Sequence, residues 1–583
     1  MKRFTSFVVA IISVLLAIFL LKDTGLFVYK FLSDAYFLHL HALALLLVVL
    51  TCVVFQYKTS RSIPTKQSVV YLAWSLYVTL YFAFCGRCEN YFCTYLLVVS
   101  IVSFSFTYLL RQGRIEPVVL YVPLVFLGVV ESFATLLQYF HLTTSNSTNF
   151  AVTGTLDNPN ITAMIVCMSI PALVEVTRLL KKAYRYVSIP VWMVVGIALM
   201  LLQCRTALIG TAIVVALWAW KGTGNYLSGS KYIKPVSIAV LVVLAVCVSV
   251  LQQQKEASAN GRLTIWKVSA GMIAEKPLAG YGYGLFQREY NLHQADYFNR
   301  KPRPEQERMN AGYTAMAYNE YVEQTVMGGL PGGLLFAAML LSLLWCGWKN
   351  RDTTFAPLTG VAAFAGMSLF NFTLQSPALL FSFTVYAAVL LAHAGTDNLV
   401  RLPVIPVKAT VLSVLAGMVI VFFSIQKYNA QKRLKEVAQM LESGQIAPAG
   451  MVLDEIEPDI STSEAFYRLK AGYYMASGNI GMARESNIKA LDYTSNPSVL
   501  METALLSERL GKQVDAERYY KIACGIEPHL FRPRAMLMEM YIRTGQNQKA
   551  KIMANEILAL RPKFKSGQVD KYKREAKVAS SRL

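Results

Sequence analysis

The amino-acid sequence predicts an all-α protein, in which a polytopic bundle of membrane helices precedes a soluble helical-repeat domain. The first observation is composition: 55% of the 583 residues are hydrophobic and only 16% are charged, a balance typical of membrane proteins. The second is a succession of apolar segments close to the roughly 20 residues that a bilayer requires. The third is a rise in charged residues, with a repeat, in the last part of the chain. Together they predict a membrane domain over residues 1–426 and a soluble domain over residues 427–583.

The apolar segments give about 12 or 13 candidate spans. The first follows Met1-Lys2-Arg3, and because no small-residue cleavage site comes after it, we interpret it as an uncleaved span. A polar loop at 253–316 interrupts the series and is longer than a simple connection needs. The candidate spans lie at 7–22, 37–56, 68–86, 92–111, 117–140, 160–180, 187–204, 206–221, 233–252, 317–347, 354–373, 376–396 and 406–426.

The net charge of +21 would suggest nucleic-acid binding in a soluble protein, but its distribution here indicates membrane topology. Basic residues gather after the even-numbered spans, which is the positive-inside pattern with a cytoplasmic N-terminus. No nucleic-acid partner is therefore expected. By parity, the loop at 253–316 and the C-terminal domain face outward. The basic run between Lys427 and Lys435 would by itself favour a cytoplasmic tail, and that alternative stays open.

The C-terminal domain carries a repeat of about 34 residues, which resembles the tetratricopeptide repeat. Three glycines are spaced 33 and 34 residues apart, and an alanine follows five residues after each one. Glycine permits the turn between two helices and alanine lets the helices approach closely, so we expect a short right-handed solenoid. Its concave face could bind a protein partner, or the domain could act as a rigid spacer. The residues are Gly478, Gly511 and Gly545, followed by Ala483, Ala516 and Ala550.

Several polar residues lie at the outward ends of spans and are candidates for a site. Arg205 stands alone in a tight turn, and an arginine at membrane depth is costly unless it is paired or lines a wet cavity; a snorkelling arginine is the alternative. Arg262 begins a helix in the loop. Glycines at 280–284 could let backbone N–H groups approach an anion, or could form an ordinary turn. Asn158 and Asn160 could cap a helix or hydrogen-bond a sugar.

These segments resemble the O-antigen ligase superfamily, which includes O-antigen ligases, related polymerases and bacterial protein O-oligosaccharyltransferases. The resemblance covers roughly residues 60–400, and some members carry a tetratricopeptide-like tail. Its motifs are Gly154-Thr155-Leu156-Asp157-Asn158-Pro159-Asn160, Cys204-Arg205, Gly261-Arg262-Leu263 with Trp266, Pro277-Leu278 with Gly280-Tyr281-Gly282, Gly284 and Phe286, Ala317-Tyr318-Asn319-Glu320-Tyr321, and Gly329-Leu330 with Gly332.

The resemblance implies a metal-independent glycosyltransferase of the GT-C type, without a cofactor, in the bacterial inner membrane. Its donor would be a glycan on a polyprenyl diphosphate at the periplasmic face. Its acceptor would be a hydroxyl of lipid A-core, of a growing glycan or of a protein, and membrane lipid would surround the carrier. Arg205 and Arg262 would hold the diphosphate, because guanidinium forks match phosphate oxygens. The implied substrate-binding residues are Asn158, Asn160, Gly280, Tyr281, Gly282, Gly284, His293, Asn319 and Glu323.

The sequence departs from the superfamily where relatives often carry a histidine as the candidate base. Tyr318 stands at that position, and a neutral tyrosine, with a pKa near 10, is a poor base. We rank Glu320 first as the base, then transfer without a general base, then His293. The alternative for Glu320 and Glu323 is a favourable interaction with the dipole of the helix they begin.

Three other functions remain to be weighed against a ligase or oligosaccharyltransferase. An O-antigen polymerase shares the topology and is the nearest alternative. A transporter is disfavoured, because the spans hold few charged residues and show no internal repeat. A scaffold anchored by the membrane domain is disfavoured, because so many spans exceed what anchoring needs.

Overall fold

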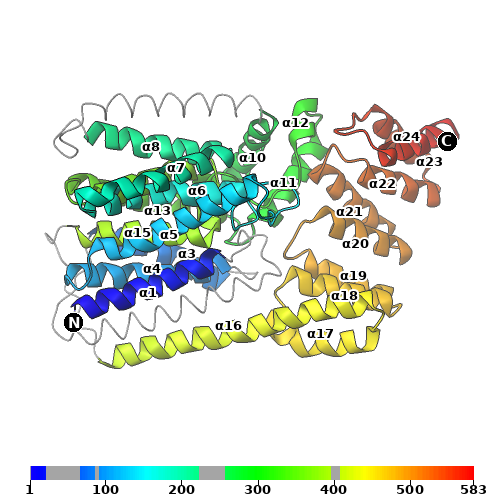
Figure 1. The fold of residues 1–583 in the computed structure, drawn as a ribbon. Coiled ribbons are helices and arrows are strands. Elements are labelled where there is room, and N and C mark those ends of the chain that lie inside the picture. The colour runs from blue at the N-terminus through cyan, green and yellow to red at the C-terminus, as the bar shows by residue number, and fades with distance from the viewer. Residues whose placement is uncertain (1, 22–65, 86–90, 222–255, 395–406, 583) are drawn as a thin grey trace.

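The computed structural model describes residues 2–21, 66–85, 91–221, 256–394 and 407–582. Within these ranges the chain is helical and contains no strand, so the predicted all-α fold is confirmed. Figure 1 shows a bundle of long helices followed by a curved array of short helix pairs.

The bundle contains ten helices from the described part of the membrane domain. Three of them, α5, α6 and α13, are long and apolar enough to cross a membrane, and shorter apolar helices accompany them. Every predicted span coincides with a described helix except 37–56 and 233–252, which lie outside the described residues. The bundle helices are α1 (Lys2–Leu21), α3 (Lys66–Cys85), α4 (Tyr91–Arg111), α5 (Pro117–Tyr139), α6 (Pro159–Leu179), α7 (Ser188–Leu201), α8 (Arg205–Lys221), α13 (Glu320–Lys349), α14 (Phe355–Ser368) and α15 (Pro377–Ala392).

Helix α15 lies at the centre of the bundle. Every residue from Pro377 to Leu391 is buried, as expected for a helix that is apolar on all sides. It packs against α4, α14 and α6, while α5 packs against α6 and α1. Two 3₁₀ segments complete this region, η1 (Lys182–Val187) and η2 (Thr373–Gln375).

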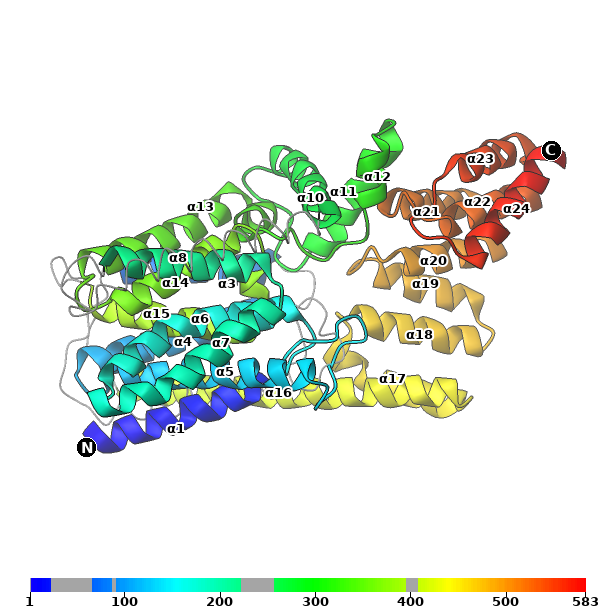
Figure 2. The ribbon, with the colours of Figure 1, turned by 45° about the horizontal axis from the view of Figure 1, so that its top comes forward.

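The predicted polar loop is itself mostly helical. It forms α10 (Glu256–Glu275), α11 (Phe286–Arg300) and the single-turn α12 (Glu305–Asn310). These helices gather at one end of the bundle, together with the loop that precedes α6 (Figures 1 and 2). At the other end, the Lys221 ammonium donates to the backbone carbonyl of Arg351 at 2.6 Å, so basic residues from two different turns lie close together there.

The helical repeats begin within a single long helix, α16 (Val407–Glu442), and continue to α24. Residue 427, where the sequence changes composition, falls inside α16, which runs along the bundle and into the repeats (Figure 1). The remaining helices are α17 (Ile446–Ile460), α18 (Glu464–Ala476), α19 (Ile480–Ala490), α20 (Pro497–Arg509), α21 (Gln513–Ile526), α22 (Arg532–Arg543), α23 (Asn547–Ala559) and α24 (Gly567–Arg582).

The repeat pattern read from glycine and alanine is confirmed by the geometry. Each predicted glycine adopts a left-handed conformation between paired helices, with φ of +76° at Gly478, +73° at Gly511 and +72° at Gly545. A left-handed residue at a helix end favours glycine, which has no Cβ to clash. Gly444, at +77°, makes the same turn between α16 and α17. The three predicted alanines are fully buried between helices, so the tail is a tetratricopeptide-type solenoid.

Helix α11 of the loop docks against the solenoid. The Gln294 amide donates to the Ile526 carbonyl at 2.7 Å, and the Asn299 amide donates to the Lys521 carbonyl at 3.0 Å. The Arg288 Nε donates to the Leu491 carbonyl at 2.9 Å. Ala295 is only 2% exposed and belongs to the same apolar cluster as residues of α20, α21 and α22. The loop and the repeats therefore share one hydrophobic core.

Candidate active site

Arg262 and Arg205 are brought together at the end of the bundle where the loop lies. Both side chains are half-buried. Burial, and then the charge of Arg205, lower the pKa of the Arg262 guanidinium below its ordinary value. Two like charges in a partly buried place repel each other, so this arrangement favours an anion between or beside them.

The contacts of Arg262 fix its position without neutralising it. Its Nη1 donates to the Phe370 carbonyl at 2.6 Å, and its guanidinium carbon lies 4.9 Å from the centre of the Tyr318 ring. Among the described residues, no carboxylate forms an ion pair with Arg262. The guanidinium is thus held by a carbonyl and an aromatic face, and its charge stays available to a ligand.

Arg205 is the first residue of α8, at the positive end of the helix dipole. The residue two positions earlier, Gln203, has a φ of +48°, which turns the chain sharply into the helix. The Cys204 thiol lies 3.9 Å from the Asn160 carbonyl, so the starts of α6 and α8 are adjacent. Helix N-termini and arginines together form a favourable setting for phosphate groups.

Asn158 and Asn319 are helix caps, which was one of the two roles considered for Asn158. The Asn158 side chain accepts a hydrogen bond from the Asn160 N–H at 2.9 Å, at the start of α6. The Asn319 side chain accepts from the Val322 N–H at 3.1 Å, at the start of α13. Each cap satisfies a backbone donor that the helix leaves open.

Tyr318 serves as the platform beneath Arg262. Its φ of +53° is uncommon for a residue other than glycine. Its ring meets Phe372 edge to face at 5.6 Å. The preceding residue is held on both sides, because the Ala317 carbonyl accepts from the Trp266 indole at 2.9 Å and its N–H donates to Glu323 at 2.8 Å.

Glu320 and Glu323 lie inside the protein, at the first turn of α13. Glu320 is 0% exposed and Glu323 2%. One oxygen of Glu320 accepts from the Leu374 N–H at 2.7 Å, and the other has no hydrogen-bond partner among the described residues. Glu323 also accepts from the Gln375 amide at 2.9 Å. These bonds tie the start of α13 to η2.

His293 belongs to a second cluster, between α10, α11 and the glycine segment. Its Nε2 lies 3.1 Å from the Tyr281 hydroxyl and 3.2 Å from Glu275, and its Nδ1 lies 2.7 Å from the Glu289 carbonyl. Burial, and then the Glu275 charge, raise the pKa of Tyr281. The contacts of His293 are thus with the loop's own residues, and they join α11 to the glycine segment.

The glycine segment packs closely on α13. The Tyr281 and Gly282 N–H groups donate to the Val326 and Met327 carbonyls, each at 2.9 Å. A Cβ at Gly280 would lie 2.5 Å from the Gly329 nitrogen, where α13 is kinked. These two N–H groups are therefore bonded to α13. Of the two interpretations of the glycine segment, the ordinary turn fits these bonds better than anion binding. Gly284 also has a positive φ, +88°.

Sequence reasoning missed the segment after α14, which supplies the carbonyl of Phe370 to Arg262 and the backbone of Leu374 to Glu320. Backbone groups of an apolar stretch leave no signal in a sequence. It also missed residues 146–150, which line a pocket in the loop before α6. Glu131, an acid within an apolar segment, was a sequence signal for this region. In the structure its carboxylate holds the loop before α6, accepting from the Thr155 N–H at 2.9 Å and from the Thr155 hydroxyl at 2.5 Å.

No metal centre is evident in the described ranges, where no three or more His, Cys, Asp and Glu side chains are grouped to hold an ion. The site is built instead from two guanidinium groups, helix N-termini and an aromatic face. It belongs to a multi-pass membrane protein, and its chemistry suits a bound phosphate ester.

A comparison with protein families indicates which class of membrane protein carries this site. The family described as O-Antigen ligase matches residues 190–337, a segment that contains Arg205, Arg262 and Tyr318. Residues 190–337 are thus similar to the O-antigen ligase family, and the resemblance drawn from the motifs is confirmed over this segment. This family supports a membrane glycosyltransferase of the ligase or polymerase type.

No curated protein matches the chain. Among solved structures, the chain is similar to one in "Crystal structure of APC/C hetero-tetramer Cut9-Hcn1", with 9% identity and a TM-score of 0.22, over 93% of this chain and 89% of that one. A likeness at this level supports no conclusion about function.

Proposed function

We propose that this protein transfers a glycan from a polyprenyl-diphosphate carrier to an acceptor hydroxyl, as an O-antigen ligase or a protein O-oligosaccharyltransferase. The observation that carries the proposal is the pair of half-buried arginines, in which the pKa of Arg262 is lowered by burial and by Arg205. A diphosphate would relieve that repulsion and accept several charge-assisted hydrogen bonds.

In the proposed reaction, the acceptor oxygen attacks the anomeric carbon of the donor sugar. The bond from that carbon to the diphosphate oxygen breaks, and its electron pair leaves with the polyprenyl diphosphate. The acceptor hydroxyl gives its proton to the departing diphosphate or to water. Negative charge grows on the leaving oxygen, and Arg205 and Arg262 stabilise it where it develops. Tyr318 holds Arg262 in place through its ring face.

The burial of Glu320 bears on which group acts as base. Its side chain is enclosed, with one oxygen on the Leu374 N–H, and His293 is engaged by Tyr281 and Glu275. General bases must reach the proton that they remove. We propose that leaving-group stabilisation supplies most of the rate enhancement and that Glu320 and Glu323 position the arginine site.

We place the site and the repeats on the periplasmic face of a bacterial inner membrane. The loop helices, the start of α6 and the repeats gather at one end of the bundle (Figure 1). Basic residues such as Lys221 and Arg351 meet at the opposite end, which the positive-inside rule assigns to the cytoplasm.

We propose that the repeats hold the loop in its working position. Helix α11 already occupies part of the solenoid surface through Gln294, Asn299 and Ala295. A protein partner, whether acceptor or recruiting factor, would then bind a face of the solenoid that α11 leaves open. Lipid A-core and protein both remain candidate acceptors.

The deciding experiment deletes the gene and restores it as wild type, Arg262→Ala or Arg300→Ala. Arg300 lies in the same loop, and its side chain is 75% exposed, so it is a matched control. Lipopolysaccharide and periplasmic glycoproteins are compared on gels, with membrane insertion of each variant checked.

Loss of long chains from lipid A-core, with accumulation of lipid-linked polymer, would identify a ligase. Loss of glycan from proteins alone would identify a protein oligosaccharyltransferase. Chains reduced to single units would identify a polymerase instead. Unchanged glycans in the deletion strain would contradict all three readings.

A further inference from the structure

The loop before α6 forms a polar pocket beside the arginine pair, and we propose that this pocket is a subsite for one sugar ring of the glycan. The pocket encloses about 320 Å³. It lies outside the segment that matches the O-antigen ligase family. The inference rests on the proposed function and adds to it the place where the sugar is recognised. The pocket is lined by Asn146, Ser147, Thr148, Asn149, Phe150, Asp157 and Asn158.

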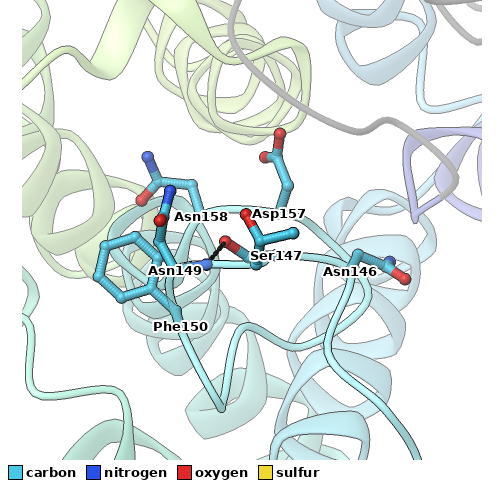
Figure 3. Close-up of a pocket in the computed structure, with 7 residues that line it drawn as sticks. Asn146, Ser147, Asn149, Phe150, Asp157 and Asn158 are labelled. Atoms are coloured by element: carbon cyan, nitrogen blue, oxygen red, sulfur yellow. Dashed lines mark hydrogen bonds between the residues drawn. The ribbon is translucent and has the colours of Figure 1, made fainter.

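The lining has the chemistry that a sugar requires. Amides, hydroxyls and a carboxylate offer both donors and acceptors to sugar hydroxyls, and an aromatic ring offers an apolar face to sugar C–H groups. In the view of Figure 3, the amides of Asn149 and Asn158 and the ring of Phe150 lie on one side of the pocket, with Asn146 on the other. Phe150 is 48% exposed, so its ring is open to a ligand.

Part of the lining is free to bind. Within the described residues, the side chains of Thr148 and Asn149 form no hydrogen bond with the protein. The backbone N–H of Asn149 donates to the Ser147 hydroxyl at 3.3 Å. This bond turns the chain and does not involve the side-chain amide of Asn149.

Hydrogen bonds hold together the loop that carries the pocket. Glu131 binds Thr155 through both carboxyl oxygens, and the Gln138 side chain accepts from the N–H groups of Thr153 and Gly154 at 2.7 and 2.9 Å. The Asn146 side-chain amide donates to the Thr155 carbonyl at 2.6 Å, so the two ends of the loop are linked. A preorganised wall lowers the entropy that binding costs.

The pocket adjoins the arginine site through α6. Asn158 lines the pocket and caps α6. Two residues further on, the Asn160 carbonyl meets the Cys204 thiol, next to Arg205. A sugar in the pocket would therefore lie close to a diphosphate held by the arginines. The sugar could belong to the donor glycan or to an acceptor glycan, and the test below separates the two.

The first test measures binding without the diphosphate. The probes are two oligosaccharides, one released by mild acid from the cell's own polyprenyl-diphosphate carrier and one released from lipid A-core. The protein is the full chain in detergent, examined by saturation-transfer NMR. We expect Phe150→Ala and Asn149→Ala each to weaken binding about tenfold, as for the loss of one good contact.

The matched control is Phe140→Ala. Phe140 follows α5 and is 64% exposed, but it does not line the pocket, so its removal should leave binding unchanged. Equal binding of each probe by wild type, Phe150→Ala and Asn149→Ala would overturn the proposal, as would the failure of both probes to bind the wild type.

The second test compares kinetic constants in a transfer assay. If the sugar belongs to the donor, Phe150→Ala raises KM for the donor about tenfold with little change in kcat; if it belongs to the acceptor, the acceptor KM rises instead. Both constants unchanged would contradict the subsite. Binding without any transfer by the wild type would leave the subsite standing and refute the proposed function.

Discussion

Gly525→Ala provides a sensitive probe of the contact between the repeats and the loop. The added Cβ would lie 2.6 Å from the Ala295 carbonyl oxygen and 2.7 Å from its Cα. Both atoms belong to the α11 backbone, so no side chain can rotate away. Helices α11 and α21 must separate by about 0.8 Å to regain the 3.4 Å of an ordinary contact.

That displacement lengthens the hydrogen bonds on either side of the contact. The bonds from Gln294 to Ile526 and from Asn299 to Lys521, at 2.7 and 3.0 Å, would pass the roughly 3.2 Å limit of good geometry. Overpacking costs about 1–3 kcal/mol, and each weakened bond costs about 0.5–1.5 kcal/mol. We expect the docked state to lose roughly 2–6 kcal/mol, or about 30-fold to 20,000-fold in its population relative to the undocked state.

Hydrogen exchange of residues 286–300, measured by mass spectrometry on the purified full chain, tests this expectation. Amides of α11 should exchange at least about tenfold faster in Gly525→Ala, with weaker glycan transfer. Gly481→Ala is the control, because a Cβ there meets only the Asn479 side chain, at 3.7 Å, and alanine favours the helix. Unchanged protection of α11 in Gly525→Ala would refute the docking argument.

Three further predictions concern the site. Arg262→Lys should retain part of the transfer activity and Arg262→Ala should lose about 100-fold or more, because lysine keeps the charge but not the fork; initial rates decide this. Tyr318→Phe should stay within about threefold of wild type and Tyr318→Ala should lose about 3-fold to 30-fold, because the ring face supports Arg262 at about 0.5–2 kcal/mol; a large loss in the phenylalanine variant would show that the hydroxyl is needed. Glu131→Ala should lower the free energy of unfolding by about 2–4 kcal/mol, because the Thr155 N–H and hydroxyl lose their acceptor; an unchanged melting temperature would contradict this.

The fold was readable from the sequence where one physical pattern dominates a segment. Apolar length predicted the bundle helices, and the spacing of Gly478, Gly511 and Gly545 predicted the repeats, because a left-handed turn requires glycine. The contact of α11 with the solenoid was not readable. Its residues are mostly polar, and hydrogen bonds such as Gln294 to Ile526 join positions far apart in the chain.

The site was readable in part, for similar reasons. Arg205 stood out because a lone arginine at the end of a span is costly, and the structure brings Arg262 beside it. The glycine segment was ambiguous, since a close approach to an anion and a close approach to α13 both require glycine, and the structure shows the second at Gly280. Glu320 was ranked first as the base from the sequence, but its carboxyl group is buried and bonded to the Leu374 N–H of η2.

Transfer by the purified protein from a polyprenyl-diphosphate-linked glycan is the most direct test of the central claim. The account predicts that Arg205→Ala and Arg262→Ala each lose about 100-fold or more of the initial rate, while exposed Arg300→Ala transfers at the wild-type rate. If both arginine variants, folded and inserted in the membrane, transfer at the wild-type rate, then the pair does not hold the leaving diphosphate and the proposed mechanism is wrong.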